Sequence, residues 1–408
     1  MTPRAAGFAF RVVAQDGHAR RGLLKTPHGE VETPTFMPVG TQGSVKTLAP
    51  WEVASTGARF VLGNTYHLML RPGAEAVARH GGLHAFARWP HAMLTDSGGF
   101  QAYSLSAGAS ASSRGRPRSG VAGDVPSPAL VDSAEEGFTF KSHIDGSTHV
   151  LTPEEAVRVQ ALLGADVQMQ LDVCPPGDSP RSVVEAAVAR TTRWARRALA
   201  VPRPEGQALF GIVQGACFAD LRRAHAEELA ALPFDGLALG GFSVGEPIDR
   251  MHETLFHVAP ALDPERPRYL MGVGTPLDLV RAIGAGVDMF DCVLPTRNAR
   301  NGQALTRFGR IVIKQARWKG DPRPIDEQCT CACCAGGFSR AYLRHLYLAG
   351  ETLCLRLLSL HNLHWYGELT AQARRAIADR AYAAWAHTTT SALTETTDTD
   401  ETRRDVDA

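Results

Sequence analysis

The sequence predicts an α/β fold: a (β/α)8 TIM barrel with an N-terminal antiparallel strand segment and a C-terminal metal-binding subdomain. Eight short apolar runs each stop at a polar residue or a glycine, and helical segments lie between several of them. The 408 residues suffice for one barrel of ~250 residues with further segments. A doubly wound open sheet is the alternative. It would need fewer strands or a Gly-rich phosphate fingerprint, and no G-x-G-x-x-G follows a predicted strand.

Composition narrows the class of protein. The chain is 44% apolar and 21% charged, which excludes a wholly disordered chain. No run of ~18 apolar residues is present, so no membrane span is predicted. The first residues lack a long apolar segment and a cleavage site, so we expect a cytoplasmic rather than a secreted protein.

The N-terminal segment, residues 1–35, is predicted to form short antiparallel strands. Asp16-Gly17 and His28-Gly29 supply turns between segments of alternating polarity. The catalytic barrel is expected over residues 36–315, with an insertion at 106–136 that is rich in Ala, Ser, Gly and Pro and predicts a mobile loop. The polar, acidic residues 388–408 predict a disordered tail.

The apolar runs predict the barrel strands, because uninterrupted apolar runs of this length suit strands that are buried on both faces. They occupy residues 35–40, 60–64, 92–96, 167–172, 208–214, 236–241, 269–272 and 287–291. The best-marked helix between them begins at Thr152-Pro153-Glu154-Glu155, an N-cap threonine with proline at the first position and glutamate at the third. Further helices are predicted at 181–200, 218–232 and 276–284.

Polar residues end several of these strands: Asp96, Asp172, Gln214, Gly240-Gly241 and Asp291. In a barrel the C-terminal strand ends meet on one face, where active sites lie. One strand-end aspartate is most often a helix cap. Three aspartates on one face repel one another and shift one another's pKa, which is seldom kept for stability alone. An active site is therefore predicted at this end.

A basic block follows the last predicted strand. Residues 297–323 contain eight basic residues against one acid, Asp321, so this segment carries +7 while the whole chain carries +1. The basic residues are Arg297, Arg300, Arg307, Arg310, Lys314, Arg317, Lys319 and Arg323. Such a block is typical of phosphate binding, and the alternative is a solvated basic face.

Residues 316–387 are predicted to form a helical, zinc-binding subdomain. Cys329-x-Cys331-x2-Cys334 places three thiolates on a tight loop, where they can share one tetrahedral ion. The candidates for a fourth ligand are His345, His361, His364 and Cys333. A Cys3His set leaves no open position for water and is therefore structural; the alternative is a cluster of free thiols. The other cysteines, at positions 174, 217, 292 and 354, suit small core residues.

Several stretches resemble tRNA-guanine transglycosylases of the bacterial type over roughly residues 8–385. They are LTDSGGFQ (94–101), FKSHIDGSTHVLTPEEA (140–156), GIVQGACF (211–218), GGFSVGEP (240–247), MGVGTPLDLVRAIGAGVDMFDCVLPTRNARNGQALT (271–306) and the cysteine block. The resemblance implies a homodimeric pentosyltransferase that exchanges guanine-34 of tRNAs with GUN anticodons (Asp, Asn, His, Tyr) for 7-aminomethyl-7-deazaguanine (preQ1), in queuosine biosynthesis. A queuine-using or archaeosine-type enzyme, a non-catalytic tRNA-binding subunit and a plain sugar hydrolase are the alternatives.

The resemblance also implies roles for single residues. Asp291 matches the nucleophile, which forms a covalent ribosyl intermediate, and Asp96 matches the general acid/base. Residues implied to contact the base are Asp96, Ser97, Gly98, Gly99, Phe100, Asp172, Gln214, Gly241, Phe242, Val244 and Met271, with Phe100 and Met271 on either side of it.

Two further groups follow from the same resemblance. The residues implied to meet the tRNA anticodon loop are Gly272, Val273, Gly274, Thr275, Pro276, Leu277, Asp278, Thr296, Arg297, Asn298, Ala299 and Arg300. One structural Zn²⁺ per chain is implied on Cys329, Cys331, Cys334 and His361.

The sequence departs from the family pattern in places. The 106–136 loop is longer than expected, an extra glycine follows the cysteines, and GGFSVGE replaces GGLAVGE. Val244 is retained where animal enzymes have glycine, which favours preQ1 over the bulkier queuine.

Overall fold

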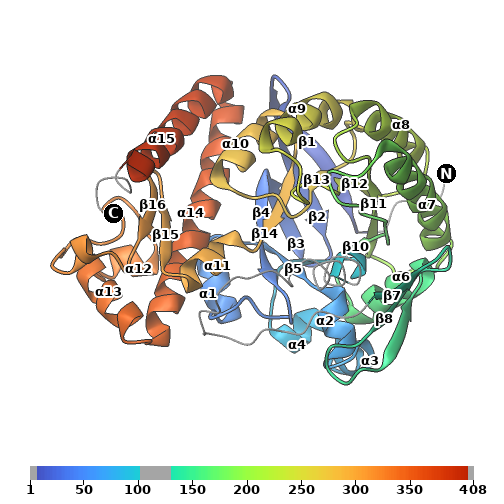
Figure 1. The fold of residues 1–408 in the computed structure, drawn as a ribbon, viewed down its shortest axis with the longest axis horizontal. Coiled ribbons are helices and arrows are strands. Elements are labelled where there is room, and N and C mark those ends of the chain that lie inside the picture. The colour runs from blue at the N-terminus through green and yellow to red at the C-terminus, as the bar shows by residue number, and fades with distance from the viewer. Residues whose placement is uncertain (1–6, 102–129, 403–408) are drawn as a thin grey trace.

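A closed barrel of eight parallel strands forms the centre of the protein, in a computed structural model that describes residues 7–101 and 130–402 (Figure 1). The strands follow one another around the barrel in the order β10-β11-β12-β13-β14-β4-β5-β6. Their bounds are β4 Thr35–Gly40, β5 Phe60–Gly63, β6 Ala92–Thr95, β10 Val167–Met169, β11 Ala208–Val213, β12 Gly236–Leu239, β13 Arg268–Leu270 and β14 Met289–Cys292. Each predicted apolar run overlaps one of these strands, and only β13 and β14 extend one residue beyond their runs, so the predicted barrel is confirmed.

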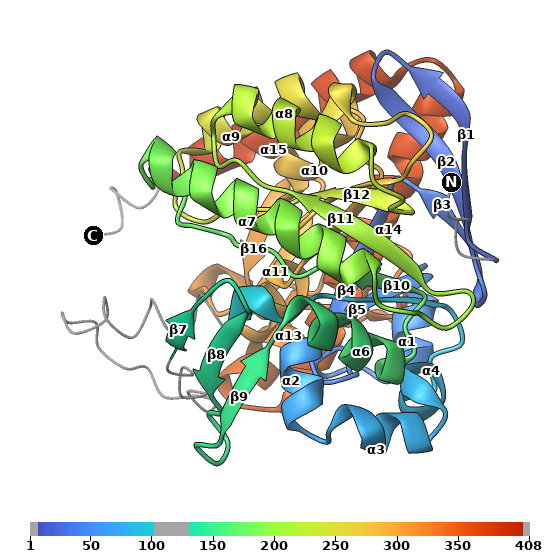
Figure 2. The same cartoon turned by 90° about the vertical axis from the view of Figure 1, so that its right-hand side faces the viewer.

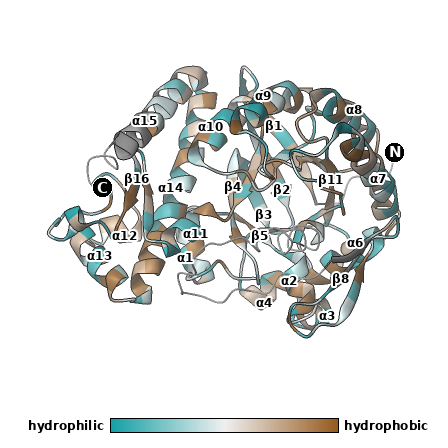
Figure 3. Ribbon diagram, viewed as in Figure 1, coloured by the Kyte–Doolittle hydropathy of each residue, from teal (hydrophilic) through white to brown (hydrophobic). Residues whose placement is uncertain are grey.

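Both faces of the barrel strands are buried, which explains their continuous apolar character. In β11, Phe210 and Ile212 belong to the cluster that fills the barrel, whereas Leu209 and Val213 belong to the cluster beneath the outer helices. Burial on two faces removes the polar positions that mark a half-exposed strand. Figure 3 shows hydrophilic and hydrophobic residues alternating around the outer helices.

The outer helices cover the barrel as expected (Figure 2). They are α1 Pro50–Ser55, α2 Thr65–Leu70, α3 Ala74–Arg79, α4 Gly82–Ala87, α6 Pro153–Leu163, α7 Arg181–Leu199, α8 Ala219–Ala230, α9 Ile248–Val258, α10 Pro276–Gly284 and α11 Leu294–Arg300. Thr152 caps α6 as predicted: its side chain accepts a hydrogen bond from the Glu155 N–H at 3.1 Å. Gly164 ends α6 with φ of 75°, a conformation that favours glycine.

The N-terminal strands form a separate antiparallel sheet, as predicted. It consists of β1 (Ala9–Asp16), β2 (Ala19–Thr26) and β3 (Gly29–Thr33) in that order. Leu24 and Val31 belong to the same apolar cluster as the barrel interior. Arg20 of β2 forms a buried ion pair with Asp288, directly before β14. The sheet therefore closes the N-terminal end of the barrel.

The predicted loop at 106–136 is wrong at its C-terminal end. Residues 106–129 lie outside the described residues, but Leu130–Ser133 form β7, which pairs antiparallel with β8 (Phe138–Lys141). β8 pairs in turn with β9 (Thr148–Leu151). Phe138 and Phe140 are buried beside Tyr66 and Trp194. A short strand is stabilised by its partner, so the composition of the segment alone did not reveal it.

The C-terminal part joins a hairpin and four helices to the barrel. The hairpin is β15 (Gln303–Thr306) and β16 (Gly309–Val312), and the helices are α12 (Ala332–Ala335), α13 (Arg340–Leu348), α14 (Thr352–Ala378) and α15 (Tyr382–Thr402). Ile325, Cys333, Leu343 and Leu358 form part of a separate core. Further along α14, Tyr366 and Ile377 pack into the cluster beneath the barrel helices, so α14 links the two cores. The domain boundaries at 315 and 387 stay predictions.

The tail predicted to be disordered from residue 388 is helical as far as Thr402. Tyr382 is buried, and Trp385, Ala386 and Leu393 are packed against the barrel cluster. These apolar residues recur at helical spacing near the start of α15, and the polar composition after them concealed the pattern. Within the described residues, no helix is long and apolar enough to cross a membrane.

Candidate active site and metal centre

The strand-end residues gather at the C-terminal end of the barrel. Asp96 follows β6, Asp172 and Gln214 follow the neighbouring strands β10 and β11, and Asp291 lies in β14. Because all eight strands are parallel, these side chains share one end of the barrel, as predicted. The negative charge of Asp291 is close enough to raise the pKa of Asp96.

Asp96 is held by the segment that begins α2. Its Oδ2 accepts a hydrogen bond from the Asn64 side-chain amide at 2.5 Å, and its Oδ1 accepts one from the Thr65 N–H at 2.8 Å. Burial, with a smaller contribution from the charge of Asp291, raises the pKa of Asp96 to about 7. A carboxyl group with that pKa can both donate and accept a proton near neutral pH.

Asp291 has hydrogen bonds on one oxygen. The Tyr269 hydroxyl donates to Oδ1 at 2.6 Å, and the Gly272 N–H donates to the same oxygen at 2.7 Å. Burial raises the pKa of Asp291, while these two bonds stabilise the anion and oppose that rise. Among the described residues no hydrogen bond reaches Oδ2, so this oxygen is available to a substrate.

Asp172 and Gln214 form a buried pair. The Gln214 side-chain amide donates to Asp172 Oδ2 at 2.6 Å, and burial raises the pKa of Asp172 to about 6. Gln214 Oε1 is buried without a partner in the described part of the chain. A buried polar atom of this kind is normally paired, so it marks a place where a polar ligand fits.

Two glycines lie tightly against Gln214. A Cβ at Gly241 would lie 2.3 Å from Gln214 Oε1, and one at Gly240 would lie 2.8 Å from Gln214 Nε2. Gly241 also has φ of +66°, which favours glycine. The backbone after β12 therefore lies so close to Gln214 that only glycine fits at these two positions.

The remaining candidates around the base occupy several segments. Ser97, Gly98 and Gly99 are buried after β6, whereas Phe100 is 46% exposed. Met271 is half-buried against the barrel interior. After β12, Phe242 is buried and Val244 is half-buried, and the Val244 N–H donates to the Glu246 carboxylate at 2.9 Å. That Phe100 and Met271 lie on either side of a base stays a prediction.

The two segments implied to meet RNA flank Asp291. In residues 272–278, Gly272 binds Asp291, and Thr275 with Asp278 forms a capping box that starts α10. Residues 296–300 lie in α11, where Arg297 is exposed and Arg300 is half-buried. Figure 1 shows α11 between the barrel and the C-terminal helices.

The basic block is partly neutralised in the fold. Arg307 pairs with Asp326 at 2.7 Å, and Asp321 pairs with both Arg323 at 2.8 Å and Arg340 at 3.1 Å. The net charge of +7 already counts Asp321, whereas Asp326 lies outside residues 297–323. The Arg307–Asp326 pair therefore lowers the charge that the block offers to phosphates below that count.

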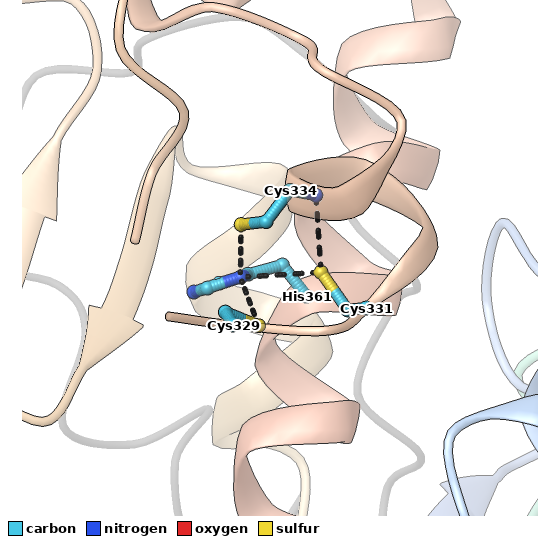
Figure 4. A group of neighbouring side chains, drawn as sticks. All are labelled: Cys329, Cys331, Cys334 and His361. Atoms are coloured by element: carbon cyan, nitrogen blue, oxygen red, sulfur yellow. Dashed lines mark hydrogen bonds between the residues drawn. The ribbon is translucent and has the colours of Figure 1, made fainter. Parts of the chain in front are cut away.

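Three cysteines and one histidine converge in the C-terminal part (Figure 4). The Sγ atoms of Cys329, Cys331 and Cys334 lie 3.6, 3.5 and 3.3 Å from His361 Nδ1. Tetrahedral Zn–S and Zn–N bonds place sulfur about 3.5 Å from nitrogen, so the donor set fits such an ion. The His361 Nε2–H donates to the Leu305 carbonyl at 2.8 Å, which leaves Nδ1 as the ligand atom.

The other candidates for a fourth ligand lie outside this group of four. His364 lies 3.2 Å from the Thr330 hydroxyl instead. Cys333 is buried in the core of the C-terminal part. The structure thus selects His361, which α14 presents to the cysteine loop.

Sequence reasoning missed the residues that hold the carboxylates. Tyr269 lies two positions before Met271 and shares its inward face, a period-two signal that marks it as a barrel-interior residue. Asn64 ends the predicted run 60–64, so its position at a strand end is the signal that could have identified it. Thr65 reaches the Asp96 carboxylate through its backbone N–H, which no side-chain motif reveals, and its hydroxyl donates to the Asp96 carbonyl.

Comparisons with known proteins agree over nearly the whole chain. A family model described as queuine tRNA-ribosyltransferase matches residues 15–395. The chain is 66% identical over 383 residues to the queuine tRNA-ribosyltransferase of Sorangium cellulosum, covering 94% of this chain and 91% of that protein. It is 51% identical to the protein of that name from Nitratidesulfovibrio vulgaris (92% and 94% covered) and 48% identical to that from Neisseria meningitidis (92% and 96% covered).

Proposed function

Since the chain belongs to the queuine tRNA-ribosyltransferase family, whose members are pentosyltransferases that act on tRNA, we propose that it replaces guanine-34 of GUN-anticodon tRNAs by preQ1. The tRNAs would be those for Asp, Asn, His and Tyr, and the reaction would be a step of queuosine biosynthesis. The observation that best supports this proposal is the pair of half-buried carboxyl groups, Asp96 and Asp291, which interact electrostatically but have different hydrogen-bond partners.

The proposed reaction proceeds through a covalent ribosyl–Asp291 intermediate. Asp291 Oδ2 forms a bond to ribose C1′ as the C1′–N9 bond of guanine breaks, and protonated Asp96 supplies the proton that the leaving guanine takes up. The incoming base then gives a proton to Asp96 and attacks C1′, which releases Asp291. Two displacements on one carbon retain its configuration. The hydrogen bonds from Tyr269 and Gly272 support Asp291 as the anion that this step requires.

The base would be recognised by the Asp172–Gln214 pair and the backbone beside it. Asp172, with a pKa of about 6, is mostly ionised at neutral pH and can accept hydrogen bonds from two N–H groups of guanine or preQ1. The Gln214 amide and the Gly241 N–H can donate to the purine carbonyl. Adenine presents the opposite pattern at that carbonyl position and would be rejected. Phe100 and Met271 would offset part of the unstacking cost of a few kcal/mol.

The tRNA would be held around Asp291 by residues 272–278 and by α11. The exposed Arg297 and the half-buried Arg300 would neutralise phosphates of the anticodon loop, which is single-stranded and so offers splayed bases. We further propose that the enzyme is a homodimer.

A Zn²⁺ ion is proposed for the Cys329, Cys331, Cys334 and His361 group. Its chemistry there would be structural: four protein ligands leave no position for water, and binding would contribute to folding. The ion would join the cysteine loop to α14, the helix that links the C-terminal core to the barrel.

The function is tested by incubating the protein with GUN-anticodon tRNA and radiolabelled guanine. Label should enter the tRNA at position 34, and unlabelled preQ1 should displace it. A matched tRNA with another base at position 34 is the control. Absence of label in the GUN tRNA would indicate a non-catalytic tRNA-binding subunit, and release of free guanine without exchange would indicate a hydrolase.

Substitution of Val244 should change the preference between incoming bases. The wild type should use preQ1 efficiently and queuine poorly, because the valine side chain fills volume that the cyclopentenediol of queuine needs. Val244→Gly should raise kcat/KM for queuine by roughly 10-fold or more, as expected for relieving a steric clash in a base site. Equal rates with the two bases in the wild type would contradict the size argument.

The pH dependence should reveal Asp96. As the general acid it must be protonated, and its pKa is raised to about 7, so release of guanine in a single turnover should fall as pH rises through about 7. Val244→Gly retains all three carboxylates and should show the same decrease. A rate of guanine release that stays flat from pH 6 to 9 would remove Asp96 from this role.

A further inference from the structure

Helix α8 places two ionisable side chains directly behind the base-contacting segments. Arg222 and His225 lie one turn apart, and their exposed fractions are only 0% and 1%. Figure 2 shows α8 lying over β11 and β12. Arginine is almost never fully buried unless it is paired, so the partners of Arg222 indicate its purpose.

Arg222 binds main-chain carbonyls from two strand ends. Its Nε–H donates to Ala216 O at 2.5 Å and Nη1 donates to Val213 O at 3.2 Å, both in the segment that carries Gln214. Nη2 donates across to Gly241 O at 3.1 Å. Among the described residues its hydrogen-bond acceptors are all main-chain carbonyls, so the guanidinium positions backbone. The charge of Glu246 acts on it only beyond ion-pair distance.

The same guanidinium supports Phe242. Its central carbon lies 3.7 Å from the centroid of the Phe242 ring, within cation–π distance. Gly215 allows this arrangement, because a Cβ there would lie 2.6 Å from Arg222 Cγ. The contacts of Arg222 therefore tie the loop after β12 to the loop after β11.

His225 holds Gln214 itself. The Gln214 N–H donates to His225 Nδ1 at 2.9 Å. Burial lowers the pKa of His225 to about 4, which keeps the ring neutral at physiological pH. Two residues of one helix face thus fix the backbone on either side of the Asp172–Gln214 pair.

We propose that Arg222 is a positioning and specificity-determining residue: it sets the spacing between Gln214 and Gly241 to the width of a purine carbonyl. This inference rests on the proposed function, in which these two residues donate to that carbonyl. A shift of about 1 Å in such donors weakens recognition severely. Asp172 would recognise the N1–H and 2-amino groups beside the carbonyl. Arg222 makes no hydrogen bond to Asp172, so this part of the recognition should be preserved.

The test is Arg222→Lys, which keeps the charge and loses the planar fork. The KM for guanine should rise about 10-fold or more, while kcat at saturating guanine should change by less than about 3-fold. The KM for tRNA should stay the same. Discrimination against 2,6-diaminopurine, which lacks both the carbonyl and the N1–H, should fall by the share that the carbonyl contributes. Discrimination against hypoxanthine, which lacks only the 2-amino group seen by Asp172, should remain.

Arg20→Lys is the matched control. Arg20 is also a buried arginine that donates to main-chain carbonyls, Pro264 O and Arg266 O, and lies over a phenylalanine ring, but at the opposite end of the barrel. The Arg20→Lys variant should have a lower Tm than the wild type and the same discrimination between bases. If Arg222→Lys does not fold, Arg222→Gln, which keeps a single amide donor, serves in its place.

The outcomes separate the two proposals. A wild type that does not exchange guanine would overturn the proposed function. A wild type that exchanges guanine, with Arg222 variants that lower only the Tm or lose both discriminations equally, would overturn the role of Arg222 alone.

Discussion

Asp291→Asn is expected to lower guanine exchange by several orders of magnitude, on the order of 10⁴-fold or more. The variant keeps the shape of the side chain and an oxygen that can accept from Tyr269 and Gly272, but it has no anionic oxygen to attack ribose C1′. Its affinity for tRNA should change little, because the substitution leaves Arg297 and Arg300, which we propose to contact phosphates, in place. Exchange of labelled guanine and filter binding of tRNA measure the two quantities separately.

Asp96→Asn is the matched control, since it makes the same replacement at the other half-buried carboxylate of the pair. With wild-type enzyme and tRNA, a protein–RNA adduct that resists denaturation should accumulate when the second base is withheld. The adduct should map to Asp291 by mass spectrometry and vanish in Asp291→Asn. If it persists there and disappears in Asp96→Asn, the two roles are reversed. Retention of configuration without any adduct would argue against the covalent mechanism.

Cys331→Ala should remove the metal and destabilise the C-terminal part of the protein. Cys331 is one of the three thiols around His361, and its sulfur also accepts the Cys334 N–H at the start of α12. Structural zinc sites bind with about 10–16 kcal/mol, and much of that becomes folding free energy. We expect one zinc per wild-type chain by elemental analysis, none in Cys331→Ala, and a clearly lower Tm for the variant.

Cys333→Ala controls for the loss of a buried thiol from the same loop. Cys333 lies between the ligands but outside the group of four, so its variant should keep the metal. A chelator should lower the Tm of the wild type and of Cys333→Ala, and leave Cys331→Ala unchanged. If the wild-type protein contains no zinc and its Tm does not change in the presence of a chelator, the proposed structural zinc site is wrong.

The barrel could be predicted because its signal is local. Each strand buries both faces, and this requirement appears as an uninterrupted apolar run such as 208–214. The same runs predicted which residues share the catalytic end, because parallel strands carry their C-terminal residues to one face. The spacing of Cys329, Cys331 and Cys334 was enough to predict a shared ion, since three thiols on one short loop cannot lie far apart.

Features that depend on a distant partner could not be predicted in this way. β7 exists because β8 lies beside it, and the first turns of α15 fold against the barrel cluster. The basic block loses part of its charge to Asp326, which lies outside it, only when Arg307 and Asp326 meet in the fold. His361 was one of four candidate ligands until α14 brought it to the cysteines.

One physical cause separates the features that could be predicted from the sequence from those that could not. Hydrophobic burial acts on each segment and leaves a periodic pattern in it, so strands, helices and the end of the barrel that carries the carboxylates can be predicted from local sequence. A hydrogen bond or an ion pair needs two groups at a short distance in the fold. The number of residues between two groups in the sequence does not indicate whether they meet. Tyr269 on Asp291, Asn64 on Asp96 and Arg222 on Gly241 became known only from the folded arrangement.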